Sequence, residues 1–274
     1  MNPYQGCEHG CIYCYARTTH DYWGYNAGLD FERKILYKSN AVELLKKQLN
    51  SKRWKPSPIF LSGNTDCYQP IEKKLQLTRD LLKVLLEYKH PVRILTKNSL
   101  IERDIDILSE LAKLNLVSTA MSFTSLDNKL RSNLEPRTSS AKNKLKTIEK
   151  LANNNIPIQI LIGPVIPGLN SHEVPDIIEQ TANAGANWAG HTIIRVFGAT
   201  LIVFEDWMEK TYPNQKNKVM QYITGANKKT HEAAETSRMI TSLVNISRNK
   251  HMKKPNLELE TSLFSVPKDQ LTLF

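Results

Sequence analysis

The feature that most constrains the fold is a regular alternation of short apolar runs and amphipathic segments between about residues 40 and 200. The apolar runs begin near residues 58, 92, 116, 157 and 190, and segments with helical spacing separate them. Such runs predict buried strands, and strands that alternate with helices are typical of βα units with a parallel sheet. The sequence therefore predicts an α/β fold.

The two ends of the chain depart from this pattern. After about residue 200 we expect two helical stretches, near 214–224 and 230–249, and no strand. The predicted domains are therefore a core over 1–200 and a helical C-terminal extension with a tail over 201–274. At the other end only Met1 to Tyr4 precede a cluster of cysteines, too few for a strand. A first strand is thus expected to be either missing from this chain or dispensable.

Composition narrows the class of protein. Hydrophobic residues make up 41% of the 274 residues and charged residues 23%, as in soluble globular proteins. No apolar run approaches the roughly 18 residues of a membrane span, and no secretory signal is visible, so we expect a cytoplasmic protein. The net charge of +10 favours a polyanionic partner. Lysine patches such as Lys142 to Lys150 are interpreted as solvated faces that together can track a phosphate backbone.

Three of the four cysteines lie within eight residues, as Cys7, Cys11 and Cys14. Gly6 and Gly10 let the backbone turn tightly, so that three thiolates can converge on one centre. A closed zinc site or a fully ligated cubane needs four ligands, whereas three cysteines leave a [4Fe–4S] cluster with one open iron. An open position is what a reactive metal site keeps for substrate or cofactor.

Two other ligand sets remain open at this point. His9 would complete a Cys3His zinc site, and Cys67 would serve as a distant fourth ligand of a closed cluster.

The cysteine segment resembles the signature loop of the radical S-adenosylmethionine (SAM) enzymes. The resemblance implies that the three cysteines hold a [4Fe–4S] cluster and that SAM chelates the fourth iron. It also implies one-electron cleavage of SAM to methionine and a 5′-deoxyadenosyl radical, with a flavodoxin or ferredoxin as electron donor. The implied fold is a partial (β/α)6 TIM-like barrel.

The resemblance extends over nearly all of residues 2–225. Five segments resemble an uncharacterised bacterial branch that is similar to spore photoproduct lyase: Asn2-Pro3-Tyr4-Gln5-Gly6-Cys7, Thr65-Asp66-Cys67-Tyr68-Gln69-Pro70-Ile71-Glu72, Leu95-Thr96-Lys97, Glu135-Pro136-Arg137 and Ile166-Pro167-Gly168-Leu169.

Candidate cofactor-binding residues follow the predicted strands, since parallel barrels carry function at the carboxyl ends of their strands. Asn64, Thr65 and Asp66 are expected to bind the SAM amino group or ribose, unless they form an ordinary polar turn. By similarity, Lys97 is expected to reach the SAM carboxylate, and Ser122 to contact the carboxylate or ribose. For these two the alternatives are a solvated lysine and a satisfied core serine.

The remaining candidates are less directly placed. Arg137 is expected to hold a carboxylate bidentately, with a surface ion pair to Glu135 as the alternative. In the family, residues at the places of Tyr13 and Tyr15 contact the cluster or the adenine, although aromatic groups here also suit simple packing.

The catalytic residues are not fixed by the sequence, and the candidates are Cys67 and Tyr68. In spore photoproduct lyase a cysteine in the corresponding stretch donates the hydrogen atom. Here Asn64 or Thr65 falls nearest that place and Cys67 lies slightly beyond, a departure that argues against the lyase reaction itself.

Three functions compete. The leading hypothesis is a radical SAM enzyme that acts on DNA or RNA, as a repair lyase or a base-modifying enzyme. The second is a radical SAM enzyme that acts on a peptide, a protein or a metabolite. The third is a non-catalytic metal-binding module for nucleic acids, which the open-iron count and the barrel pattern disfavour.

The C-terminal segment resembles the QLxLF peptide by which bacterial replication and repair proteins bind the sliding clamp. Its anchors would be Gln270, Leu271, Leu273 and Phe274. The alternative is that these apolar side chains pack back onto the barrel.

Overall fold

The computed structural model describes residues 1–253, 255 and 258–267 and shows an α/β fold, as the alternating pattern predicts. The elements are, in chain order, β1 (Tyr4–Gln5), η1 (Tyr15–Trp23), α1 (Leu29–Arg33), β2 (Leu36–Tyr37), α2 (Ala41–Leu49), β3 (Ile59–Leu61), α3 (Glu72–Leu75), α4 (Leu77–Glu87), β4 (Val92–Thr96), η2 (Ser99–Asp104), α5 (Ile105–Lys113), β5 (Val117–Phe123), α6 (Asn128–Leu134), α7 (Ala141–Asn153), β6 (Ile158–Val165), η3 (Ser171–Glu173), α8 (Val174–Asn183), β7 (Trp188–Ile193), α9 (Gly198–Thr211), α10 (Pro213–Lys228) and α11 (His231–His251).

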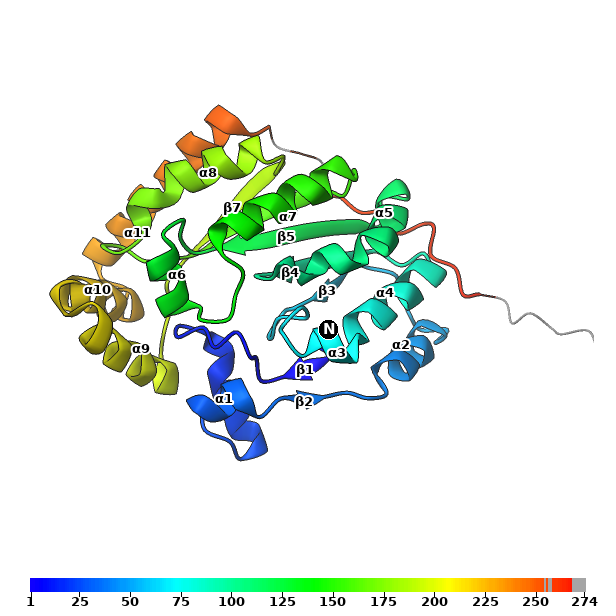
Figure 1. Ribbon diagram of the computed structural model, residues 1–274, viewed down its shortest axis with the longest axis horizontal. Coiled ribbons are helices and arrows are strands. Elements are labelled where there is room, and N and C mark those ends of the chain that lie inside the picture. Colours follow the sequence, from blue (N-terminus) through cyan, green and yellow to red (C-terminus); the bar gives the residue numbers. More distant parts are fainter. Residues whose placement is uncertain (254, 256–257, 268–274) are drawn as a thin grey trace, which may run out of the picture.

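The centre of the molecule is a five-stranded parallel sheet in the order β3-β4-β5-β6-β7, so each strand pairs with the next one along the chain. Figure 1 shows α7 and α8 beside the β5–β7 part of this sheet, α4 and α5 near β3 and β4, and β1, β2 and α1 at the bottom of the view. Apolar side chains from the sheet and from α4, α5, α7 and α8 form most of the main core. All five predicted strands are confirmed.

The N-terminal expectation is wrong in one respect, because a short strand does precede the cysteines. β1 pairs antiparallel with β2, with Tyr4 opposite Tyr37, and this pair does not join the parallel sheet. Within the described residues the parallel sheet therefore has five strands, and none of them comes before the cysteine loop.

The helices after the sheet comprise the two expected ones, α10 and α11, and one that the sequence did not predict, α9. The apolar residues of α9 are spread around the helix instead of forming a stripe, and only Thr200, Phe204 and Met208 are buried. α11 packs along α8 and β7 and places Ile240 and Val244 in the main core. No helix in the described part of the chain is long and apolar enough to cross a membrane.

Candidate cofactor and active site

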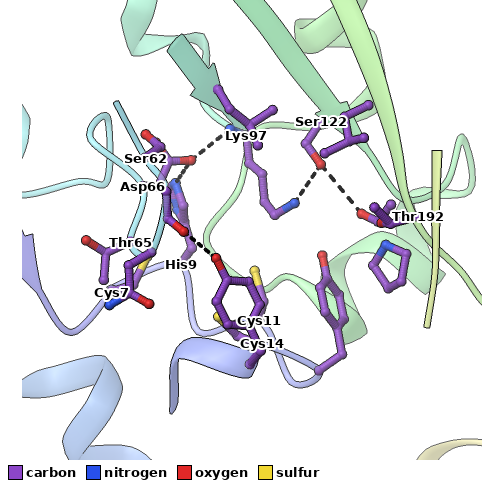
Figure 2. A pocket seen from close by; sticks show the side chains of 18 of the residues that line it. Cys7, His9, Cys11, Cys14, Ser62, Thr65, Asp66, Lys97, Ser122 and Thr192 are labelled. Carbon is purple, nitrogen blue, oxygen red and sulfur yellow. Dashed lines mark hydrogen bonds and ion pairs between the residues drawn. The ribbon is translucent and has the colours of Figure 1, made fainter. Parts of the chain in front are cut away.

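A cavity of about 370 Å³ lies at the carboxyl ends of the parallel strands, where barrels of this kind place their active sites. Its volume falls in the range of cofactor and substrate pockets. Figure 2 shows the three cysteines on one side of it and Lys97 and Ser122 on the other. The lining residues are Cys7, His9, Cys11, Tyr13, Cys14, Tyr15, Phe60, Ser62, Gly63, Asn64, Thr65, Asp66, Leu95, Thr96, Lys97, Ser122, Leu161, Gly163, Pro164, Thr192, Ile193, Ile194 and Arg195.

The loop that carries the cysteines is shaped by one buried side chain. The guanidinium of Arg17 donates hydrogen bonds to the carbonyl oxygens of Cys11 (2.9 Å) and Gly10 (3.0 Å). It also donates to those of Ala27 and Gly28 and forms an ion pair with Glu32 at 2.6 Å. Because Arg17 is only 1% exposed, these contacts hold the loop without competition from water.

The chemistry of this loop fits an iron–sulfur cluster. Burial raises the pKa of the Cys7 thiol to about 12, and burial also raises the pKa values of Cys11 and Cys14. Metal ligation needs thiolates, so cluster assembly here must release protons. No three His, Cys, Asp or Glu side chains of the described residues gather closely enough for a single metal ion. Cys7, Cys11 and Cys14 all line one cavity, and three thiolates are the ligand set of a cubane with one open iron.

His9 does not act as a zinc ligand in this geometry. Its Nδ1 lies 3.0 Å from the carbonyl oxygen of Arg137, and its Nε2 lies 3.2 Å from Oδ2 of Asp66. Both ring nitrogens thus lie beside protein atoms, an arrangement that disfavours the Cys3His alternative.

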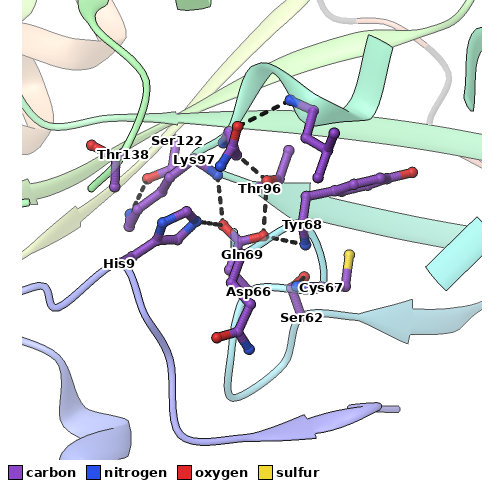
Figure 3. A network of polar contacts seen from close by, with 12 residues as sticks. His9, Ser62, Asp66, Cys67, Tyr68, Gln69, Thr96, Lys97, Ser122 and Thr138 are labelled. Carbon is purple, nitrogen blue, oxygen red and sulfur yellow. Dashed lines mark hydrogen bonds and ion pairs between the residues drawn. The ribbon is translucent and has the colours of Figure 1, made fainter. Parts of the chain in front are cut away.

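Asp66 ties three parts of the site together (Figure 3). Its carboxylate accepts hydrogen bonds from Thr96 Oγ1 and from the backbone N–H groups of Lys97 and Tyr68, each at 2.8 Å, and pairs with His9. Burial alone would raise the pKa of Asp66, but the charge of His9 and these hydrogen bonds outweigh it and lower the pKa. Asp66 thus links the loop after β3 to the end of β4 and to the cysteine loop.

Asn64 and Thr65 also line the cavity, as expected for the end of β3. The Thr65 hydroxyl donates to the carbonyl oxygen of Tyr4 at 2.8 Å, so it supports the loop from behind. The Asn64 side chain makes one long contact of 3.4 Å to Thr19. Among Asn64, Thr65 and Asp66, Asn64 therefore has the most hydrogen-bonding capacity left for a ligand.

Lys97 and Ser122 meet across the floor of the cavity. Lys97 Nζ donates to Ser122 Oγ at 2.6 Å and lies 3.4 Å from Oε1 of Glu135. Lys144 Nζ donates to the carbonyl oxygen of Ser122 at 2.8 Å and lies 3.4 Å from Oε2 of the same glutamate. The buried carboxylate of Glu135 thus pairs with two buried ammonium groups, those of Lys97 and Lys144. These three side chains together carry one more positive than negative charge next to the cavity.

The two lysines respond oppositely to this environment. Burial would lower the pKa of Lys97, but Glu135, the nearby cysteines and Asp66 together raise it. For Lys144 burial outweighs the attraction of Glu135, and the pKa is lowered. Lys97 lines the cavity and is thus the group that can offer a stable positive charge to an anionic ligand.

Tyr13 and Tyr15 both line the cavity, on either side of Cys14. The Tyr13 hydroxyl donates to Glu135 and lies 3.3 Å from Thr124 Oγ1, so its ring is fixed from below. Tyr15 is 55% exposed and its hydroxyl donates to the carbonyl oxygen of Gly63. Tyr15 therefore stands at the rim and Tyr13 within the wall.

Four predicted site residues do not reach the cavity. Cys67 packs in the main core, and the hydroxyl of the buried Tyr68 donates to Asp104 at 3.1 Å. Glu135 lies beneath the lining. Arg137 pairs with Glu32 and donates to the carbonyl oxygen of Glu8, so it fastens the cysteine loop. Among the described residues, these four side chains are therefore not placed to line the cavity in which SAM is expected to bind.

Arg17, Lys144 and His9 support the site in roles that sequence reasoning missed. For Lys144 a signal existed, because it falls on the buried stripe of α7 with Ala141, Ile148 and Leu151. Its assignment to a solvated lysine patch is wrong, since the side chain is 1% exposed.

Comparison with known proteins identifies the class to which this site belongs. The family model described as Radical SAM superfamily matches residues 1–181. The chain therefore belongs to the radical SAM superfamily, and the cofactors of that family are a [4Fe–4S] cluster and S-adenosylmethionine. The cysteine loop and the adjoining cavity are where the described residues fit both.

Two curated relatives illustrate how much of the chain these similarities cover. An uncharacterized protein of Mycobacterium tuberculosis is 30% identical over 215 residues, which cover 78% of this chain and 63% of that protein. A radical SAM Nalpha-GlyT isomerase of Pseudomonas phage M6 is 28% identical over 197 residues, covering 70% of this chain and 38% of the phage protein. The chain spans less than two thirds of the length of these relatives.

The fold is similar to that of spore photoproduct lyase. A mutant of that enzyme, solved with bound AdoMet and dinucleoside spore photoproduct, superposes with a TM-score of 0.55 at 18% identity. The match covers 77% of this chain and 61% of the lyase chain. The partial TIM-like barrel expected from the sequence is thereby confirmed.

The positions of Lys97 and Ser122 lead to a first prediction. We expect Lys97→Met and Ser122→Ala each to weaken SAM binding by roughly 10- to 100-fold, because each removes a hydrogen-bonding group beside a charged ligand. Calorimetric titration of anaerobically reconstituted protein measures this. Ser118→Ala is the matched control: it lies on the same strand, but its hydroxyl contacts Gln159 at 2.7 Å and it does not line the cavity. Equal SAM affinity in all three variants would contradict the assignment.

Proposed function

We propose that the chain is a radical SAM enzyme that modifies or repairs a base in a nucleic acid. The observation that carries this proposal is the rim of the cavity, which reaches the surface at both outer strands of the sheet. Phe60 of β3 is 44% exposed and Tyr15 is 55% exposed, while the exposed Arg195 follows β7. Aromatic faces stack on nucleobases and cations bind phosphates, so the rim suits a nucleotide.

In this proposal the cofactors supply the reactive species and the chain positions it. When bound, the cluster and SAM together generate a 5′-deoxyadenosyl radical that abstracts hydrogen from substrate. Lys97 and Ser122 bind and orient the charged part of SAM, and Tyr13 forms the wall beside it. Asp66 fixes the relative position of the cysteine loop and the ends of β3 and β4.

The placement of the cysteines favours base modification over the lyase reaction. Within the described residues, the thiols that line the cavity are those of Cys7, Cys11 and Cys14, which are expected to be cluster ligands. Cys67 is buried in the main core and cannot hand a hydrogen atom to a substrate in the cavity. The similarity in fold to spore photoproduct lyase supports a nucleic-acid substrate, and the net charge of +10 agrees with it.

Several further features belong to the same proposal. We infer a reducing, cytoplasmic setting and a flavodoxin or ferredoxin as electron donor. We also propose that the helices after residue 200, α9, α10 and α11, take part in binding substrate. The clamp-binding motif at Gln270, Leu271, Leu273 and Phe274 lies outside the described residues, and its contact with a sliding clamp stays a prediction.

SAM cleavage tests the proposal directly. We expect formation of 5′-deoxyadenosine to rise about tenfold or more when single-stranded DNA or RNA is added to the reduced, reconstituted enzyme. The reason is that substrate binding precedes productive cleavage of SAM. Mass spectrometry measures the 5′-deoxyadenosine. The Cys11→Ala variant, treated identically, is the control. Stimulation by peptide or metabolite mixtures with no response to either polymer would favour the second hypothesis. A protein with bound zinc and no SAM cleavage would favour the non-catalytic module.

A further inference from the structure

A second cavity continues from the cofactor site along the end of β7. It has a volume of about 450 Å³ and shares Thr192, Ile193, Ile194 and Arg195 with the first cavity. Its other wall comes from α10 and α11 and the turn between them, and it comprises Tyr222, Ala226, Lys229, Thr230, Ala233, Ala234 and Ser237. We call this second cavity the β7–α11 groove. The groove and the cofactor cavity therefore meet at one strand end.

The charge in this groove is entirely positive. Arg195 and Lys229 line it, and no Asp or Glu does. Neither cation has an ion pair or a hydrogen bond from its side chain within residues 1–253, 255 and 258–267, and both are exposed. The arginines that shape the site behave differently, since Arg17 and Arg137 are both paired with Glu32. Two unpaired cations in a groove are available to an anion.

Local structure explains why these two cations face the groove. Ile194 and Val196 are buried in the apolar cluster beneath α9 and α10, so the alternation of an extended chain turns Arg195 outward. Lys229 follows α10 as its C-cap residue in the left-handed region, with φ of 58°. Asn227 Nδ2 donates to the carbonyl oxygen of Val196 at 3.1 Å, which joins the end of α10 to the loop after β7. Arg195 and Lys229 therefore lie on two segments that this hydrogen bond holds together.

A third cavity extends the same path between α10 and α11. It has a volume of about 810 Å³ and shares Tyr222, Thr230 and Ala233 with the groove. Lys216 in its wall is paired with Glu209 at 2.8 Å and Glu205 at 3.4 Å. Its other lysines, Lys218 and Lys228, have no such partner in the described part of the chain. Lys218 and Lys228 thus continue the positive charge away from the cofactor cavity along α10, while Glu232 of α11 adds one carboxylate to the facing wall.

We propose that the β7–α11 groove binds the sugar–phosphate backbone of the nucleic-acid strand whose reacting nucleotide occupies the cofactor cavity. This inference rests on the proposed function and adds the direction in which the strand leaves the site: from β7 past Arg195 and Lys229 toward Lys218 and Lys228. A single strand suits the arrangement, because a nucleotide can enter the cavity without being extracted from a duplex. The contacts are to phosphate and predict little sequence preference.

The test compares two double variants that remove the same charges from different places. Arg195→Gln/Lys229→Gln alters the groove. Lys52→Gln/Arg53→Gln is the matched control, since both residues are exposed and precede β3 at the opposite end of the sheet. Fluorescence anisotropy with a labelled single-stranded DNA, the same sequence as RNA, and polyglutamate measures binding at several salt concentrations, with iron content recorded for each protein.

We expect the groove variant to lose roughly tenfold or more in affinity for both polynucleotides. The slope of log affinity against log salt should fall by about 1.4, since each phosphate contact to a single strand contributes about 0.7. The control variant should bind like the unaltered protein. Equal losses in both variants, an unchanged slope in the groove variant, or equally tight binding of polyglutamate would overturn the inference while leaving the proposed function standing. Absence of binding to either polynucleotide by the unaltered protein would overturn both.

Discussion

Cys7→Ala, Cys11→Ala and Cys14→Ala will each yield a folded protein without a stable iron–sulfur cluster. Each removes one of three thiols that line the same cavity, and two thiolates cannot hold a cubane whose fourth iron is kept open for SAM. We expect about four iron and four sulfide per chain in the unaltered protein after anaerobic reconstitution, and near-complete loss of both in each variant. Iron and sulfide analysis, together with the visible absorption that dithionite bleaches, measures this.

Cys67→Ala is the control for these variants. Its thiol is buried in the main core away from the cavity, so the iron content should stay unchanged. The loss of packing should cost roughly 0.5–3 kcal/mol of stability. Loss of iron from a folded Cys67→Ala protein would show that the ligand set is wrong.

Glu135→Gln will lower the free energy of unfolding by about 3–5 kcal/mol, because it leaves the buried ammonium groups of Lys97 and Lys144 without a negative charge. Urea denaturation of the protein without its cluster measures this. Glu102→Gln is the matched control. Glu102 of η2 pairs at 3.0 Å with Lys150, which lies on α7 like Lys144 but at the surface, where such pairs contribute about 0–1 kcal/mol.

A second substitution tests the cause. Adding Lys144→Met to Glu135→Gln removes one of the uncompensated charges and should recover part of the lost stability. No recovery, or a single-variant loss no larger than that of Glu102→Gln, would show that charge compensation is not what Glu135 provides.

The same carboxylate gives a pH dependence with a definite sign. Burial would raise the pKa of Glu135, but Lys97, Lys144 and the hydroxyl donors around it hold the pKa well below its usual range. A depressed folded-state pKa adds stability above the unfolded pKa of about 4.3, and that stability is lost as pH falls toward the folded value. The difference in stability between the unaltered protein and Glu135→Gln should therefore shrink below about pH 4.

The sheet could be predicted from the sequence because its cause is local. Runs such as Ile158–Val165 are apolar and β-branched, and helical stripes lie between them, so the period of hydrophobicity identifies each element. α9 escaped prediction because its residues Leu201, Ile202, Val203 and Phe204 form a continuous apolar run with no stripe. This segment is stabilised as a helix because Phe204 and Met208 pack in the apolar cluster beneath α9 and α10. The spacing of apolar residues in the sequence does not reveal that packing.

The site was predictable only where chemistry follows directly from residue type. The cysteine spacing and the polar residues after β3 indicate a metal loop and a strand-end site. Glu135 and Arg137, only two residues apart, instead face different surroundings: one is buried between two lysines, and the other pairs with Glu32 of the N-terminal segment. The direction of the Arg137 side chain depends on its contact with Glu32, which lies more than 100 residues away along the chain.

Arg17 has a consequence for how the enzyme is matured and repaired. Its five hydrogen-bonding partners shape the cysteine loop through protein atoms alone, and β1 and β2 close the base of the same segment. None of these Arg17 bonds uses a cysteine thiol, so we expect the loop to keep its shape before iron arrives and metal insertion to follow folding instead of driving it. Oxygen that destroys the cluster would then leave a folded protein that accepts a new one, and damage to the cofactor would not commit the chain to degradation.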